Sequence, residues 1–210
     1  MCSASTNIQK VHAMTKQSVF LVFAVLLCAV AKAGECDHMA RTLAAMREKD
    51  QAVRERAMSD DAIKEMRTID VANTRRLAHL LKVCGWPVAR KGDLQASDDV
   101  WLLAQHADHD KAFQHHVLGL LEQAVHRGEA RGKHLAYLTD RLAIAEGKPQ
   151  LYGTQLMVDG CKIELHPIDS RAAVNERRKK IKGMQSLEEY ERAAVDVLLP
   201  AECKQAAKLK

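Results

Sequence analysis

The richest group of side chains that could do chemistry lies in the segment 105–110, which reads Gln-His-Ala-Asp-His-Asp. If one helix runs through this segment, His106 and Asp110 lie one turn apart on a shared face. Asp108 or Asp110 would then hold the imidazole in one tautomer, so that His106 could act as a general base. The alternative is a helix that starts at an Asp108 cap, with solvated histidines around it. We expect no metal or other cofactor, because His106 and His109 lack a fixed third ligand.

A second polar group follows in the stretch 137–141. Tyr137 and Arg141 are four residues apart and face the same side of a predicted helix, and Asp140 lies one turn from Tyr137. The planar guanidinium of Arg141 could clamp an anionic ligand. It could equally form a buried ion pair with a carboxylate such as Asp108, which would fix how two helices pack. Both readings stay open.

A third polar group stands at the entry to a predicted β-hairpin, in the segment 150–155. Alternation along a strand would place Gln150 and Tyr152 on one face, with Gly153 on the other. Gly153 would allow a close approach by a ligand or by another part of the chain. These polar residues, together with Gln155, could bind a ligand or form a structural hydrogen-bond network.

The spacing of these groups predicts the elements that must position them. Helices are expected over about 37–58, 60–83, from 97 to 110 or beyond, 113–128 and 133–146. Strands at 151–158 and 161–166 flank Asp159-Gly160, a favoured pair for a tight hairpin turn. Two short helices follow, the second with Ser186 and Glu189 as a capping box. We therefore predict a mainly α fold with one small β-hairpin near the C-terminal third, in a single domain over residues 34–210.

The first 33 residues are predicted to be a signal peptide. They carry three Lys and no acidic residue, an apolar run over 19–30, and a small-x-small cleavage pattern at Ala31-Lys32-Ala33. We expect cleavage after Ala33, a periplasmic or secreted protein, and no stable membrane insertion. Without this segment the formal net charge falls from +5 to +2, and aromatic residues make up only 4% of the chain. Neither value supports nucleic-acid binding.

Four cysteines remain after residue 33, and an even number in an exported protein favours disulfide bonds. Three connectivities are open. Pairing Cys36 with Cys84 and Cys161 with Cys203 would tie each terminal segment to its neighbourhood. No CxxC pair is present, so structural zinc and thioredoxin-like chemistry are not expected.

The chain resembles domain of unknown function family 6624, a bacterial family. The resemblance rests on Gly-Trp-Pro at 85–87, Trp-Leu-Leu-Ala-Gln-His-Ala-Asp at 101–108, Tyr-Leu-Thr-Asp-Arg at 137–141 and Tyr-Gly-Thr-Gln at 152–155. It covers about residues 70–190 and implies no particular activity. It does direct attention to a set of polar residues, namely Gln105, His106, Asp108, Gln114, Asp140, Arg141, Gln150, Tyr152 and Gln155. His109 is not part of the family pattern, which weighs against a metal site.

Two functional hypotheses follow. The first is an exported binding or inhibitory module, resembling an immunity protein, that acts on a protein partner. The second is a hydrolase-like enzyme in which His106, its carboxylate and Arg141 form a pocket for an anionic or cell-envelope substrate. No phosphate-binding loop, nucleophile elbow or metalloprotease helix is present to decide between them.

Overall fold

The computed structural model describes residues 34–56, 59–88 and 93–207, with side chains to residue 204. The signal peptide predicted for residues 1–33 lies outside these ranges. The fold is mainly α with one small antiparallel hairpin, as predicted. Its elements, in chain order, are α2 (Met39–Arg54), α3 (Asp60–Cys84), α4 (Gln95–Gln105), α5 (Lys111–His126), α6 (Gly132–Ala145), β1 (Leu156–Asp159), β2 (Lys162–Leu165), α7 (Arg171–Lys179), α8 (Leu187–Leu198) and α9 (Ala201–Ala207).

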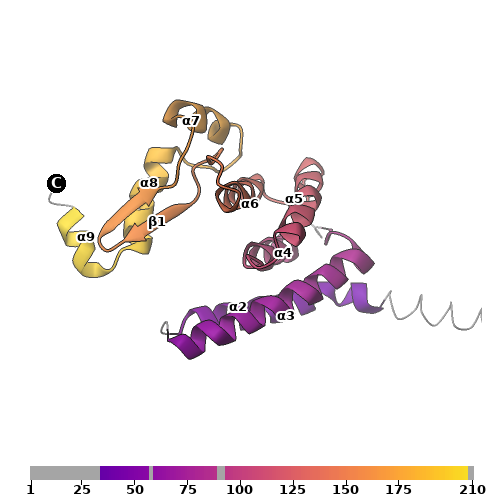
Figure 1. The fold of residues 1–210 in the computed structure, drawn as a ribbon. Helices are drawn as coiled ribbons and strands as arrows, with labels where there is room; N and C mark the ends of the chain where they lie inside the picture. Colours follow the sequence, from indigo (N-terminus) through magenta and orange to yellow (C-terminus); the bar gives the residue numbers. More distant parts are fainter. Residues whose placement is uncertain (1–33, 57–58, 89–92, 208–210) are drawn as a thin grey trace, which may run out of the picture.

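The helices form successive groups along the chain (Figure 1). The long helices α2 and α3 lie side by side as one layer, and α2 and α3 also contact α4. Helices α4, α5 and α6 pack together as a second group. The hairpin, α7, α8 and α9 form a third group, in which α8 contacts β2.

The core lies where α2 and α3 meet the group α4–α6. Its fully buried apolar side chains include Leu43, Leu77, Leu80, Val100, Val117, Leu121 and Leu138. The apolar side chains of α3 are buried only in its C-terminal part, at Leu77, Leu80 and Leu81, whereas Ile63, Met66 and Ile69 stay partly exposed. None of the helices in the described ranges is both long and apolar enough to cross a membrane.

The helix predicted to run from residue 97 to 110 or beyond starts before residue 97 and ends before residue 110. It begins at Gln95 and ends at Gln105, and a separate helix starts at Lys111. The cap of that helix is Asp110, not Asp108: its carboxylate accepts the backbone N–H of Phe113 at 2.9 Å. The same-face pairing of His106 with Asp110 is therefore wrong.

The hairpin is shorter than predicted and its turn is displaced by one residue. Asp159 pairs with Lys162, so the two turn residues are Gly160 and Cys161 instead of Asp159 and Gly160. Gly160 has a φ of +56°, which only glycine adopts readily. Residues 151–155 are not a strand but a loop, because side chains of the preceding helix and the loop itself take up its backbone groups.

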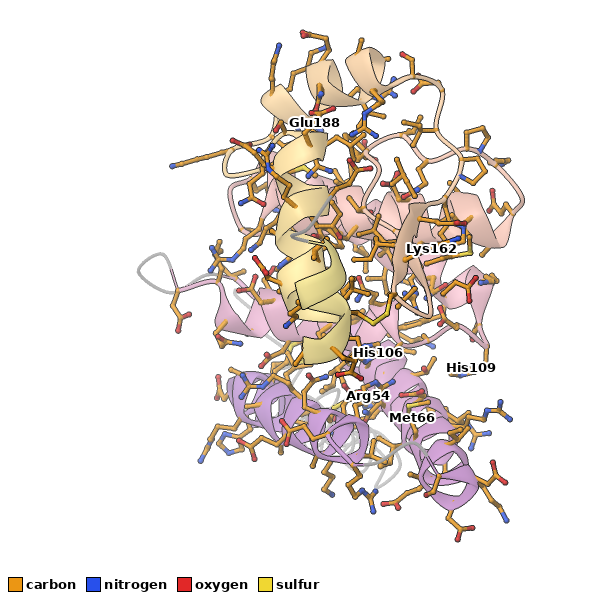
Figure 2. The ribbon with its side chains drawn as sticks, turned by 90° about the vertical axis from the view of Figure 1, so that its left-hand side faces the viewer. Arg54, Met66, His106, His109, Lys162 and Glu188 are labelled. Atoms are coloured by element: carbon orange, nitrogen blue, oxygen red, sulfur yellow. A yellow bond between two sulfur atoms is a disulfide. The ribbon has the colours of Figure 1, made fainter. Side chains whose placement is uncertain are left out.

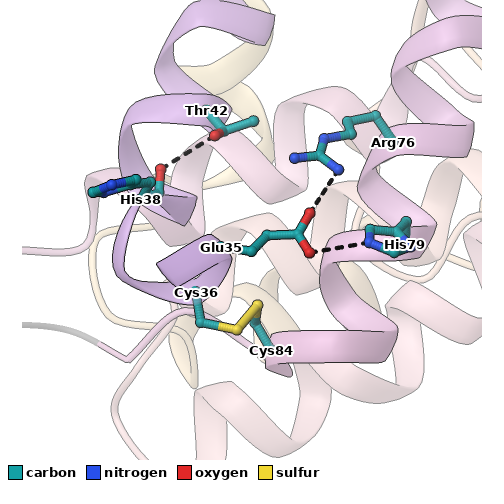
Figure 3. Close-up of a disulfide and its surroundings, with 7 residues drawn as sticks. All are labelled: Glu35, Cys36, His38, Thr42, Arg76, His79 and Cys84. Atoms are coloured by element: carbon teal, nitrogen blue, oxygen red, sulfur yellow. Dashed lines mark hydrogen bonds and ion pairs between the residues drawn. A yellow bond between two sulfur atoms is a disulfide. The ribbon is translucent and has the colours of Figure 1, made fainter. Parts of the chain in front are cut away.

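Two disulfides tie down the ends of the described chain. Cys36 bonds to Cys84 at the C-terminal end of α3, and Cys161 in the hairpin turn bonds to Cys203 in α9. This is the pairing that would tie each terminal segment to its neighbourhood. Beside the first disulfide, Glu35 forms an ion pair with Arg76 and a hydrogen bond with His79 (Figure 3). The segment before α2 is thus fixed to α3 by a covalent bond and by ion pairs.

Candidate functional site

A buried carboxylate on α2 is the centre of the candidate site. The side chain of Asp50 is 1% exposed. It accepts hydrogen bonds from Arg54 Nη1 at 2.8 Å, from Gln51 Nε2 at 2.7 Å and from His106 Nδ1 at 2.9 Å. Because Asp50 and Arg54 are four residues apart, one helix face presents both.

Helix α3 adds a second carboxylate to the same group. Arg54 Nη2 donates to Asp70 Oδ1 at 2.7 Å, so that the guanidinium bridges two carboxylates from neighbouring helices. Side-chain exposure is 21% for Arg54 and 11% for Asp70. The chain of contacts therefore runs from His106 through Asp50 and Arg54 to Asp70.

His106 follows the last residue of α4, where the backbone leaves the helix and carries the imidazole towards α2. An ionised carboxylate only accepts hydrogen bonds, so Nδ1 must carry the proton in this contact. The other ring nitrogen, Nε2, makes no hydrogen bond with any residue in the described part of the chain. In the neutral ring Nε2 is then the basic nitrogen.

Two opposing effects act on the pKa of Asp50. Burial raises it, but the hydrogen bond and charge of His106, with smaller contributions from Gln51 and Arg54, outweigh burial. The pKa of Asp50 therefore lies below its usual value. The carboxylate is ionised at neutral pH and can stabilise a positive charge on His106.

His106 opens onto a hollow of about 710 Å³ between α3 and the turn that joins α4 to α5. Figure 2 shows His106, Arg54 and Met66 close together, with His109 beyond them. Three arginines and two histidines contribute to the lining, against two carboxylates. The lining consists of Arg54, Met66, Arg67, Asp70, Val71, His106, Asp108, His109 and Arg141.

On the far side of the hollow, Arg141 and Asp108 form a two-point ion pair. Arg141 Nε donates to one oxygen of Asp108 at 2.8 Å, and Nη2 donates to the other at 2.5 Å. Burial raises the pKa of Asp108, but Arg141 outweighs it and holds that pKa below the usual range. The pair joins α6 to the turn after α4. An ion pair with Asp108 was one of the two interpretations of Arg141 drawn from the sequence. The side chains of Arg141 and Asp108 are 28% and 52% exposed, so the pair is only partly buried.

Asp140 lies away from the hollow and organises the loop before β1. It is fully buried and accepts the backbone N–H groups of Leu151, Tyr152 and Thr154 at 2.8 to 3.0 Å. The hydroxyl of Thr154 donates to the same carboxylate at 2.9 Å. A carboxylate that accepts backbone groups in this way fixes a loop.

The remaining predicted residues of the hairpin entry belong to the same loop. Gln150 is fully buried; its amide donates to the carbonyls of Gln155 and His166 and accepts the N–H of Gln155. The Tyr152 carbonyl accepts from Arg178, and the Gln155 amide reaches the Tyr137 carbonyl at 3.5 Å. The structure thus gathers these residues into a hydrogen-bond network.

Gln114 secures the turn between α4 and α5. Its buried amide donates to the carbonyls of Ala104 and Gln105, which end α4, and to Asp108 at 3.3 Å. The side-chain oxygen of Gln105 is buried without a hydrogen-bond partner in the described part of the chain. Gln114 therefore acts on the hollow indirectly, by placing His106 and Asp108.

Asp50, Asp70 and His106 are close enough to hold a metal ion, with one ligand atom of each within 4.8 Å of the others. The charges around these three residues favour the observed ion pairs over a bound metal ion. Arg54 lies between the two carboxylates and donates to both, so one of their two negative charges is already balanced and the oxygens that face each other are occupied. A metal would have to displace a guanidinium that makes charge-assisted hydrogen bonds.

Asp50, Arg54 and Asp70 were not predicted from the sequence. The available signal was Asp50-Gln51-x-x-Arg54, an acidic residue followed four positions later by a basic one. That spacing is common on solvated helix faces, so it does not identify a buried group by itself. The contact to His106 joins residues 56 positions apart, which no local pattern reveals.

The fold and the site define a mainly helical protein with two disulfides and a histidine–aspartate pair beside a polar hollow. The chain belongs to family DUF6624, described as a family of unknown function, whose model matches residues 37–199. The match extends beyond the stretch 70–190 on which the resemblance was based, and it includes α2 with Asp50. Neither the curated proteins nor the solved structures contain a match.

Proposed function

We propose that the protein is a hydrolase-like enzyme in which His106 acts as a general base on a small anionic substrate bound in the hollow. One observation carries this proposal: a buried, ionised Asp50 holds Nδ1 of a histidine that lines the hollow. A carboxylate in this position fixes the tautomer and stabilises the imidazolium that forms when the base takes a proton.

The residues of the lining favour direct attack by water. The described lining contains no Ser, Thr or Cys that could serve as a covalent nucleophile. His106 would take a proton from a water molecule through Nε2 while the oxygen attacks the substrate, and the proton would then pass to the leaving group. Arg141, held by Asp108, would stabilise the negative charge that develops.

The charges around the hollow support an anionic substrate. Arg54 and Arg141 are paired with carboxylates, whereas Arg67 is exposed and forms no ion pair in the described part of the chain. Arg67 therefore gives the rim of the hollow one cation that no carboxylate of the described residues pairs with. An exposed arginine at the rim can attract a carboxylate or phosphate and bind it with two hydrogen bonds.

The test is hydrolysis of a panel of anionic chromogenic esters, including 4-nitrophenyl phosphate and bis(4-nitrophenyl) phosphate. His106→Gln should lower kcat/KM by about 100-fold or more, as expected for the loss of a general base. The matched control is His109→Gln, which changes a histidine of the same hollow that no carboxylate among the described residues contacts. Equal losses in both variants, or no hydrolysis of any ester, would contradict the proposal.

A second candidate is an exported inhibitory module that binds a protein partner. The disulfides fit an exported protein, because such bonds persist in oxidising compartments. Four apolar side chains of β1 and α8 are also 44–79% exposed, namely Met157, Val158, Val197 and Leu198. Native mass spectrometry of the protein from its own periplasm tests this candidate. A partner at fixed stoichiometry that is lost in Met157→Ser with Val197→Ser would favour it over the enzyme.

A further inference from the structure

A groove between α2 and α3 shares no lining residue with the hollow beside His106. It has a volume of about 790 Å³. We call it the α2–α3 groove. Its lining comes from the residue before α2, from α2 itself and from α3: His38, Arg41, Thr42, Ala45, Met46, Lys49, Ile69, Ala72, Asn73 and Arg76.

The charged side chains of the α2–α3 groove are all basic. Arg41 and Lys49 form no ion pair with any residue that the structure describes. Arg76 pairs with Glu35 at 2.7 Å, beside the disulfide (Figure 3). Arg41 donates to His38 Nδ1 at 2.6 Å. The groove therefore keeps a net positive charge and fits an anion.

A buried amide in the groove lacks a partner. Asn73 is 8% exposed, and its side-chain nitrogen Nδ2 makes no hydrogen bond within the described residues. Leaving such a donor unsatisfied destabilises the fold, and buried polar groups nearly always have a partner. Asn73 stands three positions before Arg76 on the same face of α3. Both residues therefore line the same stretch of the groove.

The floor of the groove is apolar. Ala45, Met46, Ile69 and Ala72 form it, and the fold leaves Ile69 partly exposed. From His38 to Lys49 the helix advances about 17 Å. The lining has no Phe, Tyr or Trp for stacking a base or a ring. An extended aliphatic chain suits this floor better than a nucleotide does.

We propose that the α2–α3 groove binds a soluble medium-chain fatty-acid anion. The carboxylate accepts hydrogen bonds from Arg41, Arg76 and the Asn73 amide, and the alkyl chain lies along the apolar floor towards Ile69. The proposal does not depend on catalysis by His106, because the two sites have no lining residue in common.

The test is calorimetric titration of the full protein with sodium decanoate. We expect saturable binding that Arg41→Gln weakens about tenfold or more, since charge-assisted hydrogen bonds to a carboxylate are lost. Lys82→Gln, a basic residue of α3 outside the groove, is the matched control and should leave the affinity unchanged. His106→Gln should also bind decanoate normally, which separates this site from the proposed enzyme site.

Asn73→Leu distinguishes a ligand-binding amide from a structural one. We expect weaker decanoate binding with an unchanged or higher melting temperature, because the substitution removes an unsatisfied buried donor. A melting temperature that falls sharply in this variant, with decanoate affinity retained, would overturn the ligand role of Asn73. No saturation with decanoate would overturn the proposal, as would binding only to phosphatidylglycerol vesicles, which would make the groove a membrane contact.

Discussion

Asp50 and Asp140 are both buried carboxylates, yet their partners give them different roles. Asp140 accepts backbone N–H groups and a threonine hydroxyl, all from the loop that it fixes. Asp50 accepts side-chain donors, and one of them is an imidazole that lines a hollow. Burial of a carboxylate thus does not mark a functional site by itself. The chemistry of its donors does.

The structural role of Asp140 predicts a large loss of stability in Asp140→Asn. The amide would place N–H groups against backbone N–H donors and leave several of them unpaired, which should cost about 3 kcal/mol or more. Urea unfolding monitored by circular dichroism measures the loss. Asp110→Asn is the control, because asparagine caps a helix as well as aspartate does. A loss below about 1 kcal/mol in Asp140→Asn would contradict this role.

His134 should make stability depend on pH. Burial, helped by the charges of Lys133 and Arg131, lowers its pKa to about 3, and its ring stacks on Trp101 at 3.8 Å. Asp98 Oδ1 lies 3.3 Å from Nδ1. Because the folded pKa is below the unfolded value of about 6.5, the unfolded chain binds the extra proton as the pH falls below 6.5.

Stability is therefore retained above pH 6.5 and lost as the pH falls from there towards 3. The loss should approach about 1.4 kcal/mol per pH unit. Unfolding free energies between pH 6.5 and 4.5 should show a slope that is smaller by that amount in His134→Phe, which keeps a ring against Trp101. Identical slopes in the two proteins would show that His134 takes up its proton equally in both states.

Residue types alone revealed part of the candidate site. The motifs predicted His106, Asp108 and Arg141, and these three do line one hollow. They did not reveal Asp50, because its contact with His106 depends on how α2 packs against α4. Whether a polar residue binds a ligand or a backbone group is a tertiary property. For that reason the alternatives for Gln150 and Gln155 stayed open at the sequence level.

Among the elements, the loop 150–155 depends most on one glycine. Gly153 has a φ of +63°, and a Cβ atom there would lie 2.9 Å from Leu187 Cδ1. Gly153→Ala should therefore destabilise the fold by about 2–4 kcal/mol, through backbone strain and overpacking. The group closest to Gly153 is thus the side chain of Leu187 in α8. A close approach by another part of the chain was one of the two possibilities that the sequence left open for this glycine.

Gly119→Ala provides a control that should change the stability in the opposite direction. Gly119 lies inside α5, and a Cβ atom there would meet nothing within 4 Å. Alanine should stabilise the helix by about 0.5–1 kcal/mol. Thermal unfolding of both variants measures the two effects together. Equal shifts in the same direction would contradict the packing described around Gly153.

Element types were predictable because helical periodicity and capping residues are local. Ser59 caps α3, and Ser186 with Glu189 forms the expected box at α8. Two boundaries were not predictable, and both involve side chains that bind backbone groups elsewhere. Gln114 takes the carbonyls that end α4, and Asp140 takes the N–H groups that a longer β1 would have used.

Across the whole molecule, the disulfides close loops of similar length at the two ends of the described chain. The bonded cysteines are 48 and 42 residues apart. Loop-closure entropy gives about 4 kcal/mol for each. Replacing Cys36 and Cys84 by Ser should cost nearly as much as replacing Cys161 and Cys203. Urea unfolding of the two double variants compares them, and a difference above about 2 kcal/mol would contradict an entropic origin.

The candidate site also depends on how the whole molecule packs, because α2, α3 and the end of α4 each supply part of it. Its central feature is that Asp50 holds Nδ1 of His106 and leaves Nε2 as the basic nitrogen in the hollow. The most direct measurement is a long-range ¹H–¹⁵N NMR spectrum of the histidine side chains at pH 8, with His106→Gln to assign the signals. We expect His106 to carry its proton on Nδ1, with Nε2 bare and shifted on addition of inorganic phosphate, and Asp50→Asn to remove this preference. A proton on Nε2, or an even mixture of tautomers unaffected by Asp50→Asn, would contradict the assignment of His106 as the base.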